Sequence, residues 1–195
     1  MDRYDSQNDH YLIPGSSTLK NLLNITDLDA LEHAEREITA ASSRLIQFGE
    51  PPYDMAYLQQ LHHDLFCNLY AWAGQIRNVD ISKGGTRFCT ADRIVPEASK
   101  LFTQLQQHDW LRGLSPELMA ERMAYFYSEF NMIHPFREGN GRVQRLLFEH
   151  LALSAGYKLQ WGHIGDEQWT SANVESVTSQ PRQLEKLFRK GLTQL

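Results

Sequence analysis

Residues 115–156 constrain the fold most, because they carry two apolar stripes at helical spacing with a glycine-rich turn between them. The first stripe begins at Ser115, a favoured N-cap residue, and Pro116 follows at the first helical position. The second stripe includes Val143 and stops before Gly156, where a glycine commonly ends a helix. The sequence therefore predicts two helices here, one on each side of the turn.

Helical patterns also recur outside this region. Thr26 and Asp29 form a predicted capping box, and apolar residues at helical spacing follow as far as Leu45. Asp54 precedes a second stripe, which reaches Leu69. Three further helices are predicted at residues 96–107, 166–177 and 181–191. Most of the chain is therefore expected to be α-helical.

One segment has a different pattern. β-branched residues alternate between Ile76 and Ile81, and Gly84 and Gly85 then supply a turn, which predicts a small β-hairpin. No repeat, low-complexity segment or linker divides the chain. The sequence therefore predicts an all-α, mainly helical fold with one small β-hairpin, in a single domain that covers residues 1–195.

The composition fits one globular domain, because 195 residues with 42% hydrophobic content can bury an ordinary core. The formal net charge of −5 argues against broad binding to nucleic acid, which depends on a basic surface. No apolar run reaches the roughly 20 residues that span a bilayer, and the acidic N-terminus is unlike a signal peptide. Cys67 and Cys89 form no CxxC motif and are expected to be reduced thiols. We therefore expect a cytoplasmic protein with no membrane or direct nucleic-acid partner.

The turn between the two central helices, EGNGR, is suited to binding an anion. Gly139 and Gly141 permit positive φ and place no side chain between the backbone and a ligand. A glycine-rich turn that leads into a helix presents N–H groups and the helix dipole to an anion. Arg142 and Arg145 follow at a spacing of three residues, and guanidinium groups bind phosphate oxygens well. These residues predict a polyphosphate site.

Glu138 and His134 add two further chemical groups. A carboxylate beside a phosphate site repels the ligand unless a cation lies between them, and Mg²⁺ binds carboxylates together with phosphate oxygens. His134 lies four residues upstream, and an imidazole can take the proton of an attacking hydroxyl. Together these groups indicate transfer of a phosphorus-containing group to a hydroxyl. Taken singly, each also fits an ordinary structural role; Arg145, for example, could pair with Glu149 at i+4.

Residues 134–145, HPFREGNGRVQR, resemble the signature HxFx(D/E)GNGRxxR of the Fic family and match every position that it defines. Residues 70–89 are similar to the segment that leads into the flap hairpin of this family. The resemblance covers about residues 50–192, which would form the core, with residues 1–49 as an extension and first helix. It implies a compact helical fold and a protein adenylyltransferase, which transfers AMP from ATP to a Ser, Thr or Tyr hydroxyl and releases pyrophosphate.

The resemblance also implies roles for the first residues of the motif. His134 would be the general base that takes the proton from the target hydroxyl. Phe136 would anchor the loop in the core. Glu138 would bind Mg²⁺, so that ATP and Mg²⁺ would both be needed for the reaction.

The glycine-rich turn and the two arginines would bind the triphosphate. Asn140 and the backbone of Gly139 and Gly141 would form an anion hole for the α-phosphate. Arg142 and Arg145 would hold the β- and γ-phosphates of the leaving pyrophosphate.

Two further elements are assigned on the same basis. The flap would pair with the target segment as an added strand, and its residues are Lys83, Gly84, Gly85, Thr86, Arg87 and Phe88. Lys83 and Gly84 are also placed among the ATP-binding residues, although an ordinary hairpin turn explains them equally well. Trp169 and Asn173 would line the adenine pocket, and Trp169 fits the core equally well.

Variants of the family differ in the group that they transfer. Doc-type kinases carry Ala-Asn-Lys in place of Gly-Asn-Gly, so the turn of this chain favours AMP transfer. The motif alone leaves phosphocholine transfer open.

Regulation can also be inferred from the resemblance. Many relatives carry the helix motif (S/T)xxxE(G/N), whose glutamate pairs with the second arginine of the signature. Here only Ser171 and Glu175 have this spacing, and Ser176 follows in place of Gly or Asn. We therefore expect a toxin-like class without an in-chain inhibitory motif, held inactive by a small antitoxin that supplies a glutamate against Arg145. Type II topoisomerase subunits are targets of some such relatives, but no residue of this chain selects them.

Two other functions are alternatives to AMP transfer. His63 and Asp64 form the dipeptide of HD-type metal phosphohydrolases, for which His33 and Asp109 are the available partners. His62, His63 and Asp64 are more simply interpreted as a helix surface. The second alternative is a catalytically silent, nucleotide-binding regulatory module, against which the intact His134 argues.

Overall fold

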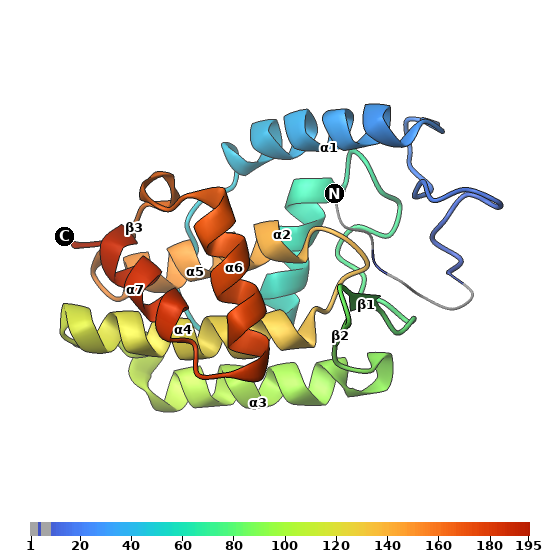
Figure 1. Ribbon diagram of the computed structural model, residues 1–195. Coiled ribbons are helices and arrows are strands. Elements are labelled where there is room, and N and C mark those ends of the chain that lie inside the picture. Colours follow the sequence, from blue (N-terminus) through green and yellow to red (C-terminus); the bar gives the residue numbers. More distant parts are fainter. Residues whose placement is uncertain (1–3, 5–8) are drawn as a thin grey trace.

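The computed structural model describes Tyr4 and residues 9–195, and within them the fold is mainly helical (Figure 1). The helices of this part of the chain are α1 Leu28–Ser43, α2 Met55–Phe66, α3 Ile94–Gln107, α4 Pro116–Ile133, α5 Asn140–Ser154, α6 Asp166–Thr178 and α7 Arg182–Gly191. Two antiparallel strand pairs join β1 Ser82–Lys83 to β2 Thr86–Arg87 and β3 Tyr157–Leu159 to β4 Leu192–Gln194. The predicted mainly helical fold with one small hairpin flap is confirmed.

Capping residues explain where several helices begin. Ser115 caps α4 and Asp54 caps α2, each through a side-chain oxygen that accepts a backbone N–H three residues later, at 3.4 and 2.8 Å. Asp27 caps α1 in the same way at 2.8 Å, so the capping box predicted to begin at Thr26 was placed one residue too early. The prediction for Leu45 was also wrong, because α1 ends before it and the residue is 81% exposed.

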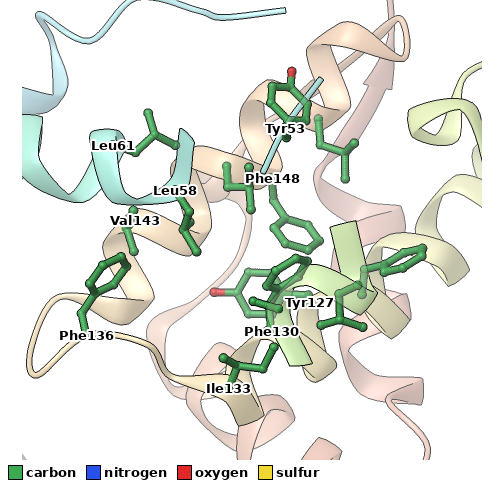
Figure 2. Packing of buried hydrophobic residues seen from close by; sticks show 14 of the residues in the cluster. Tyr53, Leu58, Leu61, Tyr127, Phe130, Ile133, Phe136, Val143 and Phe148 are labelled. Carbon is green, nitrogen blue, oxygen red and sulfur yellow. The ribbon is translucent and has the colours of Figure 1, made fainter. Parts of the chain in front are cut away.

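The core lies between α4 and α5, which Figure 2 shows from close by. The aromatic rings of Tyr127 and Phe130 on α4 lie 4.9 and 6.1 Å from that of Phe148 on α5. All three side chains are buried, and each such burial contributes roughly 1.5–3 kcal/mol. Phe136, from the loop between the two helices, is also fully buried. The loop that carries the predicted site is therefore anchored in the core.

Other helices surround this pair. In Figure 1, α1 (blue) runs along one side of the molecule and α3 (light green) along the opposite side, while α6 and α7 (red) lie across α4. The helices predicted at 166–177 and 181–191 agree with α6 and α7 to within one residue at each end.

The end of α5 was predicted correctly, but the sheet that follows was not. Gly156 has a φ of 85°, as expected for a glycine after a helix, and β3 starts directly behind it. β3 pairs with β4 near the C-terminus, with Lys158 opposite Thr193. Each strand has only three residues, which is too short for a period-2 pattern to identify. Among the described residues, no helix has the length and hydropathy needed to cross a membrane.

Candidate active site

The motif loop leaves α4 at His134 and enters α5 at Asn140. His134 is the C-cap of α4, with a φ of 47°, a left-handed conformation that turns the chain sharply. The Asn140 side chain then closes the loop, because its oxygen accepts the N–H of Phe136 at 2.8 Å and its amide donates to the carbonyl of Phe136 at 2.7 Å. The Asn140 side chain is therefore committed to the loop, which leaves its backbone N–H as the group available to an anion.

The two glycines of the loop have different structural reasons. Gly139 has a φ of 80°, and a Cβ atom there would lie 2.2 Å from Cζ of Phe66. At Gly141, no atom lies within 4 Å of the position that a Cβ atom would take. Gly139 is thus required by the fold, whereas Gly141 keeps space open at the first turn of α5. Arg142 and Val143 donate their N–H groups to the carbonyl of Gly139, whereas those of Asn140 and Gly141 have no acceptor among the described residues, as an anion site requires.

His62 supports the loop from below, and its interpretation as part of a helix surface was wrong. The ring is fully buried and stacks on Phe136 with the ring centroids 3.9 Å apart. Its Nδ1 accepts the N–H of Gly74 at 2.8 Å, so Nε2 carries the hydrogen and donates to the carbonyl of Glu138 at 3.0 Å. Burial lowers the pKa of His62 to about 4, which agrees with a neutral ring. His62 therefore fixes the backbone that carries Glu138.

The HD-type alternative does not fit this geometry. His63 and Asp64 contact each other at 3.5 Å and are both about half exposed. Across Tyr4 and residues 9–195, no group of three or more His, Cys, Asp or Glu side chains could hold a metal ion. The second histidine and second aspartate that an HD site needs are therefore not assembled beside this dipeptide.

His134 has the geometry of a general base. Its Nδ1 lies 2.8 Å from the carbonyl oxygen of Asn131, an acceptor only, so Nδ1 carries the hydrogen and Nε2 has the lone pair. The ring is 7% exposed and stacks on Phe88 with centroids 3.9 Å apart. Burial lowers its pKa to about 3. Nε2 faces the hydroxyl of Tyr4 at 2.7 Å, so the lone pair points to a position that a hydroxyl can occupy.

Arg77 holds the end of α4 against the hairpin, and no motif pointed to it. The side chain is 1% exposed and donates to four backbone carbonyls, among them those of His134 at 2.8 Å and Cys89 at 2.5 Å. A buried guanidinium satisfied by carbonyl oxygens fixes these segments relative to each other. Arg77 therefore sets the distance between the base and the flap.

The two arginines of the motif have different surroundings. Arg142 forms a salt bridge with Glu35 of α1 and also donates to the hydroxyl of Thr39 at 3.2 Å. Glu35 is 5% exposed, and its other oxygen accepts the hydroxyl of Tyr70. The sequence signal for this contact is a glutamate at a position of the otherwise apolar stripe, four residues after Leu31 and three before Ile38. Arg142 is therefore tied to α1 before any ligand binds.

Arg145 has no acidic partner within salt-bridge distance among the described residues. The pairing with Glu149 considered from the sequence does not form, because Glu149 accepts the indole N–H of Trp161 at 2.5 Å instead. Arg142 and Arg145 both line a cleft of about 710 Å³ between α1 and α5, together with Glu35. A volume of this size is typical of a ligand site.

Glu138 fits a site for a divalent cation. Its Oε1 accepts the N–H of Gly139 at 2.9 Å and lies 3.8 Å from the guanidinium of Arg142. Burial and the nearby Glu35 both raise the pKa of Glu138. A buried carboxylate with a second carboxylate close by is stabilised by a cation, and Mg²⁺ accepts one or two such ligands with phosphate oxygens.

The flap is a tight hairpin at the mouth of the site. Lys83 pairs with Thr86, and the glycines between them have φ values of 55° and 83°, as a two-residue turn requires. Lys83 lies near the motif, with its amine 5.5 Å from the ring of Tyr4. Phe88 was assigned to the target-binding surface, but it is 8% exposed and covers one side of the His134 ring. In the structure, Phe88 fixes the orientation of the His134 ring by stacking on it.

Trp169 and Asn173 lie on α6, away from the contacts that join the motif. Trp169 packs on Tyr127 and Trp161, with ring centroids 4.9 Å apart in each pair, and so it forms part of an aromatic cluster. The Asn173 side chain donates to the carbonyl of Trp169 at 2.8 Å. Because Trp161 bonds to Glu149 on α5, this cluster borders the helix that carries Arg145. The assignment of these two residues to an adenine pocket stays a prediction.

Comparison with known proteins identifies the same region. The family model described as "Fic/DOC family" matches residues 52–152. The chain is 37% identical over 193 residues to the "Probable protein adenylyltransferase Fic" of Escherichia coli, covering 99% of this chain and 96% of that protein. It is 34% identical over its full length to the "Protein adenylyltransferase VbhT" of Bartonella schoenbuchensis and spans 41% of that longer protein.

Solved structures show the same fold. The BepC protein of Bartonella tribocorum, with bound AMPPNP, aligns with a TM-score of 0.88 at 28% identity, covering 95% of this chain and 97% of that one. A Fic domain from Bartonella quintana with bound ADP also aligns with a TM-score of 0.88, at 30% identity and 94% coverage of both chains.

Proposed function

The chain belongs to the Fic/DOC family, and we propose that it is a protein adenylyltransferase that transfers AMP from ATP to a Ser, Thr or Tyr hydroxyl of a target protein. The observation that carries the proposal is the orientation of His134. Its Nδ1–H donates to the carbonyl of Asn131, so the unprotonated Nε2 faces the position of an incoming hydroxyl. Relatives of nearly equal length bear the name of this activity, and structural neighbours contain adenine nucleotides.

The proposed reaction uses the residues of the motif in turn. His134 takes the proton from the target hydroxyl while its oxygen attacks the α-phosphorus of ATP. The first-turn N–H groups of α5 at Asn140 and Gly141 stabilise the charge that develops on the α-phosphate. Arg142 and Arg145 bind the β- and γ-phosphates, which leave as pyrophosphate. Burial of the ring lowers the pKa of His134, so the ring is neutral and able to accept a proton.

Glu138 would hold Mg²⁺, which when bound supplies positive charge between the carboxylate and the phosphates. In the flap, residues 83–88, β1 and β2 pair with each other and with no third strand of the described chain, so a target segment could add a strand there. Trp169 and Asn173 are proposed to border the adenine.

We also propose a separate inhibitory partner, as in a toxin–antitoxin pair. Arg145 lines the cleft between α1 and α5 without an acidic partner in the described part of the chain. Glu175, the one in-chain candidate from the sequence, instead accepts a hydrogen bond from Gln183 of α7. A small antitoxin that places a glutamate against Arg145 would occupy the γ-phosphate position. Type II topoisomerase subunits are proposed as one class of target. A cytoplasmic location would give the chain access to this target and to the antitoxin.

The test of the transferase is labelling of cell lysate with α-labelled ATP and Mg²⁺. We expect a labelled protein band with the wild-type chain, none with His134→Ala, and an unchanged band with His63→Ala, which alters an exposed histidine. Label from γ-labelled but not α-labelled ATP would indicate a kinase. ATP binding without any transfer would indicate the silent regulatory module.

The inhibitory partner is tested with the purified chain by itself. The chain alone should be active, and Glu175→Gly should leave its activity unchanged. If the chain were inactive until Glu175 was replaced, the restraint would lie within the chain and the antitoxin proposal would be wrong.

A further inference from the structure

The hydroxyl of Tyr4 lies 2.7 Å from Nε2 of His134, at the place where the proposed reaction needs the acceptor hydroxyl. We propose that Tyr4 is itself an acceptor, so that the chain transfers AMP to its own Tyr4. This inference rests on the proposed function and adds a modification site to it.

The ring of Tyr4 is held between the flap and the motif. It lies edge-on to Phe88 and to the ring of His134, with centroids 6.0 and 5.4 Å apart. The amine of Lys83 and the guanidinium of Arg137 lie 5.5 and 5.6 Å from its centroid, within the range of cation–π attraction. Tyr4 therefore enters the site between the same two elements that are proposed to receive the target segment.

A second contact anchors Asp9 beside the motif. Asp9 and Arg137 form a salt bridge at 2.6 Å, and their side chains are only 3% and 5% exposed. Removal of one partner of a buried ion pair lowers the stability of a protein by several kcal/mol. Arg137 is also the residue before Glu138, so Asp9 is attached directly to the loop that carries the site. The position of Tyr4 is thus supported from both the flap and the loop.

The contact has the protonation state that general base catalysis needs at its start. Nδ1 of His134 donates to Asn131, so Nε2 accepts and the Tyr4 hydroxyl donates. Burial raises the pKa of the Tyr4 hydroxyl and lowers that of His134, so both groups are neutral. An O–H bond aimed at the lone pair of the base is the arrangement expected of a bound acceptor before transfer.

The step balances with ATP as the only co-reactant. The Tyr4 proton moves to Nε2 of His134, and a bond forms between the Tyr4 oxygen and the α-phosphorus. The bond from the α-phosphorus to the bridging oxygen breaks, and its electron pair leaves with pyrophosphate. The product is a phosphodiester between Tyr4 and AMP.

The experiment is peptide mapping of the purified full-length chain after incubation with α-labelled ATP and Mg²⁺. We expect one AMP on the peptide that contains Tyr4, loss of this label in Tyr4→Phe, and loss in His134→Ala. Tyr4→Phe keeps the ring and removes only the hydroxyl. Tyr125→Phe is the matched control, because Tyr125 is 39% exposed on α4, and it should keep the label. Mapping of the wild-type chain does not depend on how well any variant folds.

A mixture of two variants tests whether the transfer is intramolecular. Tyr4→Phe retains the base and His134→Ala retains the acceptor, so label on His134→Ala in the mixture would overturn transfer within one chain. If lysate proteins are labelled in a His134-dependent manner while Tyr4 carries no AMP, the self-modification is wrong and the proposed function stands. If neither Tyr4 nor any lysate protein is labelled, the proposed function itself is wrong.

Discussion

Replacement of Gly139 by alanine should destabilise the protein more than any other small change in the motif. The added Cβ would lie 2.2 Å from Cζ and 2.4 Å from Cε2 of Phe66, well inside van der Waals contact. Phe66 is fully buried, and its ring stacks on that of His62 with centroids 4.7 Å apart, so it has little room to move. The clash therefore has to be relieved by shifting the loop or the core.

The cost has two parts. A non-glycine residue in the left-handed region, where Gly139 lies at a φ of 80°, costs roughly 1–2 kcal/mol. Overpacking of a close-packed core typically costs about 1–3 kcal/mol more. The free energy of unfolding should thus fall by about 2–5 kcal/mol. In a chain of 195 residues, this corresponds to a decrease of about 10 °C in Tm.

Gly141→Ala is the matched control, two residues away in the same motif. No atom lies within 4 Å of the Cβ that it adds, and Gly141 has no positive φ. Because alanine is favoured over glycine inside a helix, this variant should be more stable by roughly 0.5–1 kcal/mol. It should nevertheless transfer AMP more slowly, since the methyl group occupies space at the first turn of α5.

Urea unfolding followed by tryptophan fluorescence measures both variants, because the chain has four tryptophans. If Gly139→Ala unfolds within about 1 kcal/mol of the wild type, the loop is not fixed against Phe66 as described. Equal destabilisation by the two variants would mean that the motif responds to any side chain, contrary to the difference between the two glycines.

Three further predictions concern charged groups of the site. Glu35→Ala should lower the free energy of unfolding by about 3 kcal/mol, because it removes the buried partner of Arg142. The control Glu97→Ala breaks an exposed pair and should have little effect, so equal effects of the two variants in urea unfolding would contradict the buried pair. Burial raises the pKa of the Glu138 carboxyl, so its ionisation near neutral pH disfavours the folded state. Glu138→Gln should therefore unfold at a higher urea concentration than the wild type and lose AMP transfer, and a lower urea midpoint would refute the raised pKa. Burial lowers the pKa of His134 from 6.5 to about 3, so the free energy of unfolding should fall as the pH falls through this interval. In His134→Gln the slope of the free energy of unfolding against pH should be smaller by up to about 1.4 kcal/mol per pH unit, and an unchanged slope would exclude the lowered pKa.

The parts of the fold that the sequence predicted are those fixed by local interactions. Ser115 and Asp54 cap their helices through contacts three residues away, and Gly156 adopts its positive φ directly after α5. The exposed Leu45 was predicted wrongly, because helical spacing alone does not show where a helix ends, and α1 ends at Ser43. The β3–β4 pair joins segments far apart in the chain, for which a single sequence carries no register signal.

The same distinction holds for the site. His134, the glycine turn and the arginines lie within twelve consecutive residues, so a shared role could be proposed for them from the spacing. The groups that position them come from elsewhere: Arg77 holds the carbonyl of His134, and His62 holds that of Glu138. A buried arginine or histidine has no sequence pattern that separates it from an exposed one. These residues therefore became visible only in the structure.

The contact between Glu35 and Arg142 changes how the charge of the site has to be understood. From the motif alone, two arginines face the triphosphate with one carboxylate beside them. In the structure Glu35 and Glu138 both lie against Arg142, so this group of three carries a net negative charge when both carboxylates are ionised. Of the two motif arginines, Arg145 is the one without an acidic partner in the described residues. The two motif arginines cannot then neutralise a triphosphate by themselves, so the contact with α1 supports the proposed divalent cation at Glu138 as much as the motif does.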